Sequence, residues 1–332
     1  MHLEIKFLVF LITLIVSFFM TKLVRVYFLG RSILDYPNNR SSHVTPTPTG
    51  GGIPILCVFF GCIGILQLYG YIVLPNIILL LILTIVLAFV SFLDDIFGLN
   101  VLFRLLVQVG CAWVAVSNGL IEGGVFGNLL APLFEKIVIV ILWVWFMNLC
   151  NFMDGIDGIV GVQALAIGLG VFILSSSSDL GFLGLILAGA MGGFLIMNWQ
   201  PAKIFLGDVG SVPVGFLAGW LLFSLSSEGN LIATVILPLY FIIDSSFTLI
   251  IRLVKFEKVW EPHRDHFYQK AVSNGKSHSE ISFAVAVTNL LLIGLLAFVD
   301  SDFGFWVMIC GLGIVGILIF WMVAGPKRKK GQ

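Results

Sequence analysis

The chain has few charged residues. Asp, Glu, Lys and Arg make up 11% of its 332 residues, whereas hydrophobic residues make up 59%. A soluble domain carries about 25% charged residues, so the composition excludes an ordinary water-soluble protein and indicates an integral membrane protein. Formal net charge is zero, and no excess of positive charge therefore points to nucleic acid as a partner.

Paired cysteines are also missing. The five cysteines all lie within apolar runs or at their ends, and none shows C-x-x-C spacing. This pattern indicates neither a disulfide framework nor a zinc site. We interpret the cysteines as small buried hydrophobic residues. No internal repeat is visible either.

Long apolar runs are abundant. A membrane-spanning helix needs about 20 apolar residues, and eleven candidate spans occur along the chain. They cover residues 5–28, 51–69, 72–92, 102–118, 133–150, 158–174, 180–197, 211–226, 231–251, 281–299 and 304–323. The first lacks a small-residue cleavage site, so we interpret it as a span and not as a cleaved signal. The sequence predicts an all-α polytopic bundle of about eleven transmembrane helices (or ten), with residues 1–332 as one catalytic domain.

Positive charge is concentrated on one side of this predicted bundle. Of the 18 Lys and Arg residues, only Lys6 and Lys136 fall on the side with the short loops. The positive-inside rule makes the other side cytoplasmic, which puts the N-terminus outside and the C-terminus inside. The predicted cytoplasmic segments are 29–50, 93–101, 151–157, 198–210, 252–280 and the basic tail 324–332.

Clusters of polar residues gather in these cytoplasmic segments. Asn151, Asp154 and Asp157 lie in N-F-M-D-G-I-D-G, where glycines break the helix. A carboxylate at a membrane helix end is costly unless it meets a cation or hydrogen-bond donors. Mg²⁺ prefers oxygen ligands and shares them with substrate phosphates, so we predict a surface that binds Mg²⁺ and a nucleotide.

The adjacent acids Asp94 and Asp95 end the third predicted span, and Arg104 follows within reach. Two neighbouring carboxylates repel each other unless a cation lies nearby. One acid could act as a base toward a phosphate, both could face Mg²⁺, or the pair could only end the helix. Arg104 could counter a phosphate charge.

Asp208 lies between two glycines in I-F-L-G-D-V-G-S, at the start of a predicted span. Free N–H groups at a helix N-terminus bind phosphate, and Asp208 could either hold a metal or cap the helix. Phe205, three residues earlier, could stack on a base.

Two loops carry further donors. Arg40 and His43 lie in R-S-S-H, before P-T-P-T-G-G-G, where glycines could let the backbone approach a ligand. His263, Arg264 and His266 lie in P-H-R-D-H, for which we favour anion binding over a metal pair. Either loop could instead be an ordinary connection.

Two other polar residues have simpler interpretations. We expect His278 to be a surface loop residue. Asp244 lies within a predicted span and is either functional or paired with a neighbouring helix.

These motifs, in this order over about residues 30–270, resemble the polyprenyl-phosphate N-acetylhexosamine-1-phosphate transferases of the glycosyltransferase family 4 type. The resemblance implies transfer of a sugar 1-phosphate from a UDP-N-acetylhexosamine to undecaprenyl phosphate, with release of UMP. It also implies Mg²⁺ (or Mn²⁺), a bacterial inner-membrane location, an active site facing the cytoplasm, and, in part of the family, a homodimer.

The resemblance also implies roles for individual residues. Asp208 and Asn151 correspond to metal ligands. Asp94, with Asp95 beside it, corresponds to the acid that deprotonates or positions the lipid phosphate. Asp154 corresponds either to a partner of the metal ligands or to a hydrogen-bond anchor.

The substrate-binding roles follow in the same way. Asp157 corresponds to the group that reads uracil and Phe205 to the stacking aromatic. Arg104 corresponds to a lipid-phosphate ligand. His263, Arg264 and His266 correspond to the diphosphate-binding loop. H-R-D-H replaces the run of consecutive histidines of the cell-wall translocase, which argues against a muramoyl-pentapeptide substrate. The R-S-S-H loop with P-T-P-T-G-G-G resembles the branch that begins O-antigen or capsule synthesis with UDP-GlcNAc, -FucNAc or -QuiNAc.

Other membrane classes share some of these features. A secondary transporter also has glycine-broken helices and intramembrane acids, but places them near the midplane. An intramembrane aspartyl protease would need Asp244 as a second acid beside Asp208. A CDP-alcohol phosphotransferase would need an A-R element that is missing here.

Overall fold

The computed structural model describes residues 3–37, 45–127, 129–175, 178–258, 263–299 and 303–324. Arg40, His43 and all of the predicted basic tail except Ala324 lie outside these ranges. The helices are α1 (Leu3–Gly30), α2 (Gly52–Leu68), α3 (Ile77–Phe97), α4 (Val101–Ser117), α5 (Pro132–Phe152), α6 (Ile159–Leu174), α7 (Asp179–Asn198), α8 (Asp208–Ser227), α9 (Leu231–Ile236), α10 (Leu239–Val254), α11 (Phe267–Ser273), α12 (His278–Leu295) and α13 (Gly304–Val323). One antiparallel pair joins β1 (Leu34–Asp35) to β2 (Thr47–Pro48).

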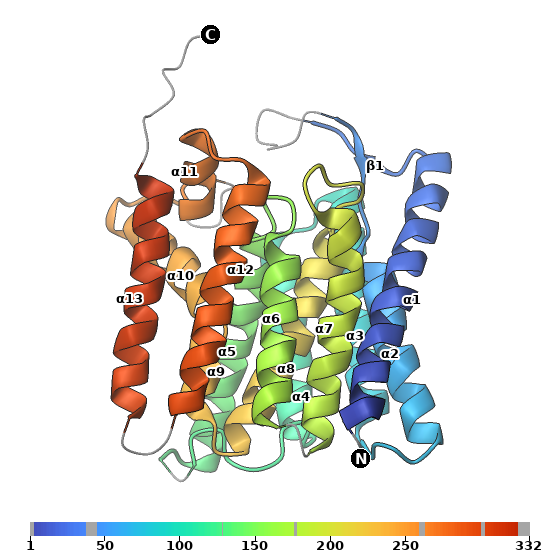
Figure 1. The fold of residues 1–332 in the computed structure, drawn as a ribbon, viewed down its shortest axis with the longest axis vertical. Coiled ribbons are helices and arrows are strands. Elements are labelled where there is room, and N and C mark those ends of the chain that lie inside the picture. Colours follow the sequence, from blue (N-terminus) through green and yellow to red (C-terminus); the bar gives the residue numbers. More distant parts are fainter. Residues whose placement is uncertain are drawn as a thin grey trace.

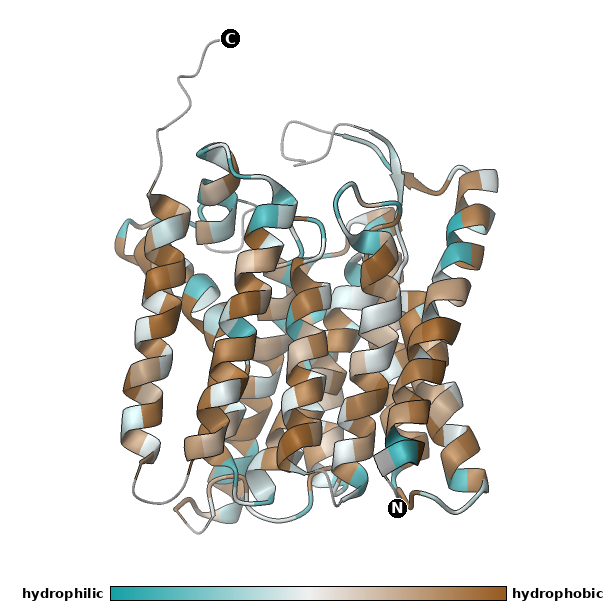
Figure 2. Ribbon diagram, in the orientation of Figure 1, coloured by the Kyte–Doolittle hydropathy of each residue, from teal (hydrophilic) through white to brown (hydrophobic). Residues whose placement is uncertain are grey.

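The helices confirm the all-α membrane class. Seven described helices are long and apolar enough to cross a membrane, and α2, α4 and α6 are shorter apolar helices. The long helices lie side by side as a bundle, and apolar residues run along most of each helix (Figures 1 and 2). The protein is therefore a multi-pass membrane protein, while the count of eleven spans stays a prediction.

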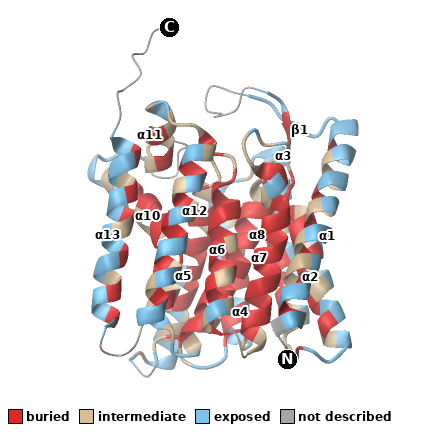
Figure 3. Ribbon diagram, viewed as in Figure 1, coloured by how far each residue is buried: buried red, intermediate tan, exposed pale blue. Residues whose placement is uncertain are grey.

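The centre of the bundle is built from helices that touch closely. α7 and α8 are almost entirely buried, whereas α1, α3 and α13 expose much of their surface (Figure 3). A Cβ added at Gly168 of α6 would lie 2.4 Å from the carbonyl oxygen of Gly184 in α7. Small residues let membrane helices approach at backbone distance, and this packing gives the site a rigid support.

One end of the bundle carries α11 and the β1–β2 pair, and the N-terminus lies at the other (Figure 1). We call the first the site end. The chain reaches it at the end of α1, α3, α5, α7 and α10, so every predicted polar cluster within the described ranges lies there. That clustering is confirmed, whereas its assignment to the cytoplasm stays a prediction.

The structure corrects several predicted boundaries. α3 continues through Asp94 and Asp95 to Phe97 and ends at Gly98 with φ 62°, because a left-handed glycine ends a helix more strongly than two acids do. The predicted span 231–251 is broken between α9 and α10 at Leu237 and Pro238, since proline offers no backbone N–H. α11 and the β1–β2 pair were not predicted.

Candidate active site

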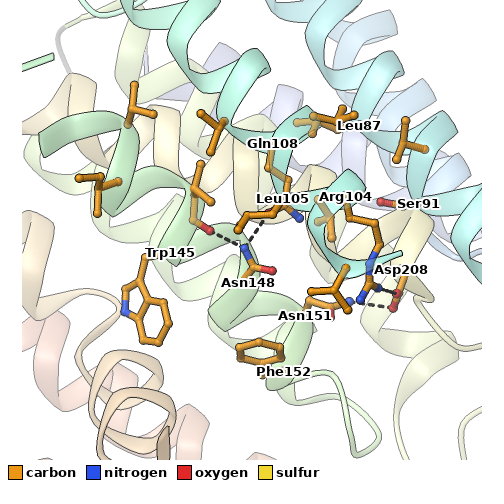
Figure 4. Close-up of a pocket in the computed structure, with 18 of the residues that line it drawn as sticks. Leu87, Ser91, Arg104, Leu105, Gln108, Trp145, Asn148, Asn151, Phe152 and Asp208 are labelled. Atoms are coloured by element: carbon orange, nitrogen blue, oxygen red, sulfur yellow. Dashed lines mark hydrogen bonds and ion pairs between the residues drawn. The ribbon is translucent and has the colours of Figure 1, made fainter. Parts of the chain in front are cut away.

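Two cavities meet at the site end. The apolar cavity, about 870 Å³, lies among α3, α4, α5 and α8, with Arg104, Asn151 and Asp208 together at one end (Figure 4). The polar cavity, about 420 Å³, lies among β1, the 154–157 loop, the 205–208 segment and the start of α12. Asp208 lines both cavities, so its side chain lies at the boundary between them.

Asn151 orients Asp208. Asp208 is the first residue of α8, and Gly207 precedes it with φ 73°. The Asn151 side-chain amide donates hydrogen bonds to Asp208 Oδ1 at 2.7 Å and to Ser211 Oγ at 3.0 Å. This leaves the side-chain carbonyl oxygen of Asn151, Oδ1, as an acceptor near Asp208. The structure thus brings together the two residues predicted as metal ligands, which are 57 positions apart in the sequence.

Arg104 connects Asp208 to Asp94. Its guanidinium forms an ion pair with Asp94 Oδ2 and lies 3.8 Å from Asp208 Oδ2. The other oxygen of Asp94 accepts a hydrogen bond from the Leu99 amide at 2.7 Å. Arg104 and Asp94 both line the apolar cavity, at the end where Asp208 closes it.

Asp95 faces the other way. It lines the polar cavity, and the Val209 amide donates to its Oδ2 at 3.4 Å. Neighbouring residues on a helix point in different directions, so the two acids of the pair serve different cavities.

Asp154 lies in a crowd of carboxylates. Burial, followed by the charges of Asp208, Asp95 and Asp157, raises the pKa of Asp154 well above its usual range. A cation placed among these groups would relieve the repulsion. Asp154 lines the polar cavity, so the structure is compatible with its predicted role as a partner of the metal ligands.

The donor set suits Mg²⁺. Among the described residues, no group of three or more His, Cys, Asp or Glu side chains converges on a metal position. Mg²⁺ commonly takes only one or two carboxylates and completes its shell with water and substrate phosphates. Asp208 and the Asn151 carbonyl offer such a partial oxygen set, and Mg²⁺ itself stays a prediction.

Asp157 contacts Ala202 and His278, and its backbone N–H donates to His278 Nδ1 at 3.4 Å. Oδ2 accepts a hydrogen bond from the Ala202 amide at 3.1 Å, and Oδ1 lies 3.4 Å from His278 Nδ1. His278 is 7% exposed and lines the polar cavity, so the interpretation of His278 as a surface loop residue is wrong. No local sequence signal separates this histidine from an ordinary loop residue, since its partner lies 121 positions away.

Phe205 lines the same cavity as Asp157, as its predicted stacking role requires. Its backbone is fixed by the first loop, because the Phe205 amide donates to Pro48 at 2.8 Å and its carbonyl accepts from Gly51 at 2.9 Å. A Cβ added at Gly52 would lie 2.2 Å from the Cα of Gly210. Gly52 therefore lets α2 approach the start of α8, while a close approach of the loop backbone to a ligand stays a prediction.

Asp244 anchors the last loop of the site end. It is fully buried and accepts hydrogen bonds from the amides of Phe267 at 2.9 Å and Tyr268 at 3.2 Å and from the Tyr240 hydroxyl at 3.0 Å. Asp244 was predicted to be either functional or paired with a neighbouring helix, and the structure shows it paired. Because its oxygens are occupied, Asp244 does not provide the free second acid of an aspartyl protease.

The histidine loop packs beside the site without lining either cavity. His266 is 2% exposed, caps α11, and has Nδ1 3.2 Å from Asp244 Oδ1. The His263 ring stacks on it at 4.9 Å. Burial, then the charges of His266 and Arg252, lowers the pKa of His263 to about 4, so it is uncharged near neutral pH. Diphosphate binding by His263, Arg264 and His266 stays a prediction.

Tyr268 connects this loop to the N-F-M-D-G-I-D-G motif. Its hydroxyl donates to the Phe152 carbonyl at 2.9 Å, and a Cβ added at Gly155 would lie 2.1 Å from that hydroxyl. Gly155 therefore allows the two motifs to pack together, although they are more than 100 positions apart.

The fold and these cavities define a helical membrane protein with one acidic site between an apolar and a polar volume. Residues 77–226 match the family model of glycosyl transferase family 4. This region contains both acids of the Asp94-Asp95 pair, Asn151 and Asp208.

Curated relatives match nearly the whole chain. A probable undecaprenyl-phosphate N-acetylglucosaminyl 1-phosphate transferase of Bacillus subtilis is 26% identical over 94% of this chain and 89% of its own length. A decaprenyl-phosphate N-acetylglucosaminephosphotransferase of Mycobacterium tuberculosis is 27% identical over 88% of this chain and 80% of its own length. An undecaprenyl-phosphate alpha-N-acetylglucosaminyl 1-phosphate transferase of Escherichia coli is 26% identical over 91% of this chain and 85% of its own length. These comparisons confirm the superfamily predicted from the motifs, that of the polyprenyl-phosphate N-acetylhexosamine-1-phosphate transferases.

Proposed function

We propose that the protein transfers an N-acetylhexosamine 1-phosphate from a UDP-sugar to undecaprenyl phosphate and releases UMP. The observation that carries this proposal is the position of Asp208, which lines both cavities. A reaction between a lipid and a water-soluble nucleotide needs a place where an apolar and a polar volume meet at charged groups.

The apolar cavity suits the lipid acceptor. Its wall is formed mainly by Leu, Val, Ile and Trp side chains of α3, α4 and α5, which favour an isoprenoid chain. Arg104 stands at its polar end, where a guanidinium can bind phosphate oxygens through charge-assisted hydrogen bonds. The phosphate would thus rest beside Asp94 and Asp208.

The polar cavity suits the nucleotide sugar. Phe205 offers a face for base stacking, and Asp95, Asp154 and Asp208 stand near the junction. Two negatively charged substrates would meet among these acids, so their charge must be neutralised. Mg²⁺ (or Mn²⁺), when bound by Asp208 and Asn151, would supply that neutralisation.

The reaction is a phosphoryl transfer. An oxygen of the lipid phosphate forms a bond to the β-phosphorus of the UDP-sugar, and the bond from that phosphorus to the bridging oxygen breaks. UMP leaves with the bridging oxygen, and the sugar phosphate becomes part of a lipid diphosphate. Such reactions depend mainly on positioning and charge stabilisation. Here Arg104 holds the attacking phosphate and Asp94 accepts its proton or orients it.

GlcNAc is the first sugar to test, because the names of the matched relatives specify N-acetylglucosamine. UDP-FucNAc and UDP-QuiNAc are the other substrates that the resemblance of the R-S-S-H loop suggests. We place the enzyme in the bacterial inner membrane with the site end facing the cytoplasm, at the start of O-antigen or another surface polysaccharide.

A transport function has less support. A transporter would bind its substrate near the middle of the membrane. Here Asp94 lies in the last turn of α3 and Asp208 is the first residue of α8, so both acids are at the ends of their helices.

The test is UMP release by the purified protein in detergent, with undecaprenyl phosphate, Mg²⁺ and each UDP-sugar in turn. We expect release only when lipid and one UDP-N-acetylhexosamine are both present. Asp208→Asn should be inactive. Asp179→Asn, a matched acid-to-amide change at the opposite end of the bundle, should keep most of the turnover. Activity of the Asp208 variant equal to wild type, or no UMP release with any sugar, would refute the proposal.

A further inference from the structure

A pair of amide side chains interrupts the wall of the apolar cavity. Gln108 of α4 is buried, Asn148 of α5 is partly buried, and both line the cavity. The pair lies between Trp145 and the end of the cavity that holds Arg104 (Figure 4). The reaction described above uses neither amide. A polar group in an apolar wall is costly unless it has hydrogen-bond partners, so the partners of this pair must be accounted for.

A backbone carbonyl fixes the direction in which the two amides face. Asn148 Nδ2 donates to the Val144 carbonyl at 2.8 Å and to Gln108 Oε1 at 2.6 Å. A carbonyl oxygen only accepts, so Asn148 must turn its N–H₂ group, and not its oxygen, toward Val144. The second N–H of that group then requires the oxygen of Gln108 opposite it. Among the described residues no hydrogen bond reaches Gln108 Nε2, which leaves an N–H₂ donor in the cavity wall.

This donor is close to the polar end of the cavity. Gln108 follows Arg104 by four residues on α4, so the two side chains share one face of the helix. α4 begins at the site end, directly after α3, and side chains of a helix lean toward its N-terminus. The Gln108 side chain therefore leans toward Arg104, from one helical turn deeper in the bundle.

We propose that Gln108 Nε2 donates a hydrogen bond to the phosphate of the acceptor lipid, beside the Arg104 guanidinium, and that Asn148 is a positioning residue for the Gln108 amide. This inference rests on the proposed function, because it takes the apolar cavity to hold undecaprenyl phosphate. An isoprenoid chain has no hydrogen-bonding atom, so the phosphate is the only part of that lipid that can accept from Gln108.

A second donor has a clear use in the reaction. The phosphate of the lipid has three non-bridging oxygens, and one of them forms the new bond. Arg104 can hold another, but its guanidinium is shared with Asp94. Gln108 can hold the third without adding positive charge near a cation at Asp208. A hydrogen bond made equally before and during the reaction lowers KM and leaves kcat unchanged.

The experiment compares two probes, farnesyl phosphate and farnesol, which share one chain and differ in the phosphate. Their binding to the full-length protein in detergent is measured by calorimetry, without UDP-sugar. We expect wild type to prefer farnesyl phosphate. Gln108→Met has a similar length and no donor, and should lower this preference about tenfold while farnesol binds as before. Gln67→Met, the same change on α2 and away from both cavities, should keep the preference.

Turnover gives a second measure of the same contact. In the UMP-release assay, Gln108→Met should raise KM for undecaprenyl phosphate by a similar factor, with kcat and the KM for the UDP-sugar close to wild type. A merely structural role would instead lower the thermal midpoint and leave the phosphate preference unchanged.

Asn148→Leu tests the positioning role. Leu has a similar size and cannot donate, so the Gln108 amide can then present either its oxygen or its nitrogen to the phosphate. The preference for farnesyl phosphate should fall, but by less than in Gln108→Met. The double variant should match Gln108→Met alone, because Asn148 acts only through Gln108. Losses that add in the double variant would overturn the positioning role.

The outcomes separate this inference from the proposed function. If wild type releases UMP but Gln108→Met keeps the wild-type preference for farnesyl phosphate, the inference is overturned and the function stands. Should Gln108→Met not fold, Gln108→Glu replaces the donor with an acceptor at the same volume, and an unchanged preference there has the same meaning. Equal binding of both probes by wild type also overturns the inference. If no UDP-sugar gives UMP release while Gln108→Met still loses the preference, the proposed function fails and the phosphate contact stands.

Discussion

Replacing Arg104 with Gln should change metal binding and acceptor binding in opposite directions. The Arg104 guanidinium pairs with Asp94 and lies 3.8 Å from Asp208 Oδ2. In the proposed function, Arg104 would attract the lipid phosphate and repel a divalent cation held at Asp208. Arg104→Gln removes that charge and keeps a side chain of similar length.

The size of the effect follows from the separation of the charges. Two unit charges at this distance interact by about 1 kcal/mol in a water-like medium and by about 4 kcal/mol at an effective dielectric constant near 20. The side chains of Arg104 and Asp208 are 32% and 34% exposed, so solvent screening puts the value near the lower end. An energy of about 1–2 kcal/mol corresponds to about a 5- to 30-fold change in affinity.

Two assays measure the two opposite changes, in Mg²⁺ affinity and in the KM for the lipid. Thermal unfolding across a Mg²⁺ titration, without substrates, reports metal affinity through the stabilisation that binding gives, and it should show half-saturation at a lower concentration in the variant. UMP release across a lipid titration should show a higher KM for undecaprenyl phosphate. Lys22→Gln, an exposed charge on α1, is the control and should change neither value. Weaker Mg²⁺ binding in Arg104→Gln would refute the reasoning.

Three further predictions concern the metal and the packing of the site end. EDTA should stop UMP release, and Mg²⁺ or Mn²⁺ should restore it, because the acids at the junction otherwise repel both substrates; activity that survives EDTA would contradict the metal prediction. Gly52→Ala should lower the thermal midpoint by a few degrees, since its Cβ would meet the Gly210 backbone at 2.2 Å, whereas Gly61→Ala, in open space on the same helix, should not. Asp244→Asn should cost about 2–4 kcal/mol of stability in denaturant unfolding, because an amide N–H₂ would face buried donors of α11; unchanged stability would show that Asp244 is not the anchor described above.

The membrane elements could be predicted from sequence because a long apolar run has few structural solutions. In lipid the backbone must satisfy its own hydrogen bonds, so such a run forms a helix. The predicted spans 133–150 and 304–323 correspond closely to α5 and α13 for this reason. The site residues could be found because acids and amides at membrane helix ends are costly, and Asn151, Asp94 and Asp208 do lie together.

What the sequence did not predict depends on contacts between distant segments. His278 has the local character of a helix start, and only the position of Asp157 makes it part of a cavity. Asp244 has the character of an intramembrane functional acid, and only α11 shows that it caps a helix from another element. The R-S-S-H loop, with Arg40 and His43, lies outside the described residues, so its predicted phosphate contacts stay a prediction.

The Asp94-Asp95 pair shows why neighbouring residues can have different functions. As adjacent residues of a helix they differ by about 100° in direction. Asp94 therefore lines the apolar cavity, where Arg104 pairs with it, and Asp95 lines the polar cavity beside the first turn of α8. In the proposed function, an acid that lines the apolar cavity can act on the lipid phosphate. An acid that lines the polar cavity can only act on the nucleotide sugar or its metal. The Asn variant of Asp94 should therefore raise KM for the lipid most, and the Asn variant of Asp95 should raise KM for the UDP-sugar; the same substrate affected in both would show that the pair acts as one group.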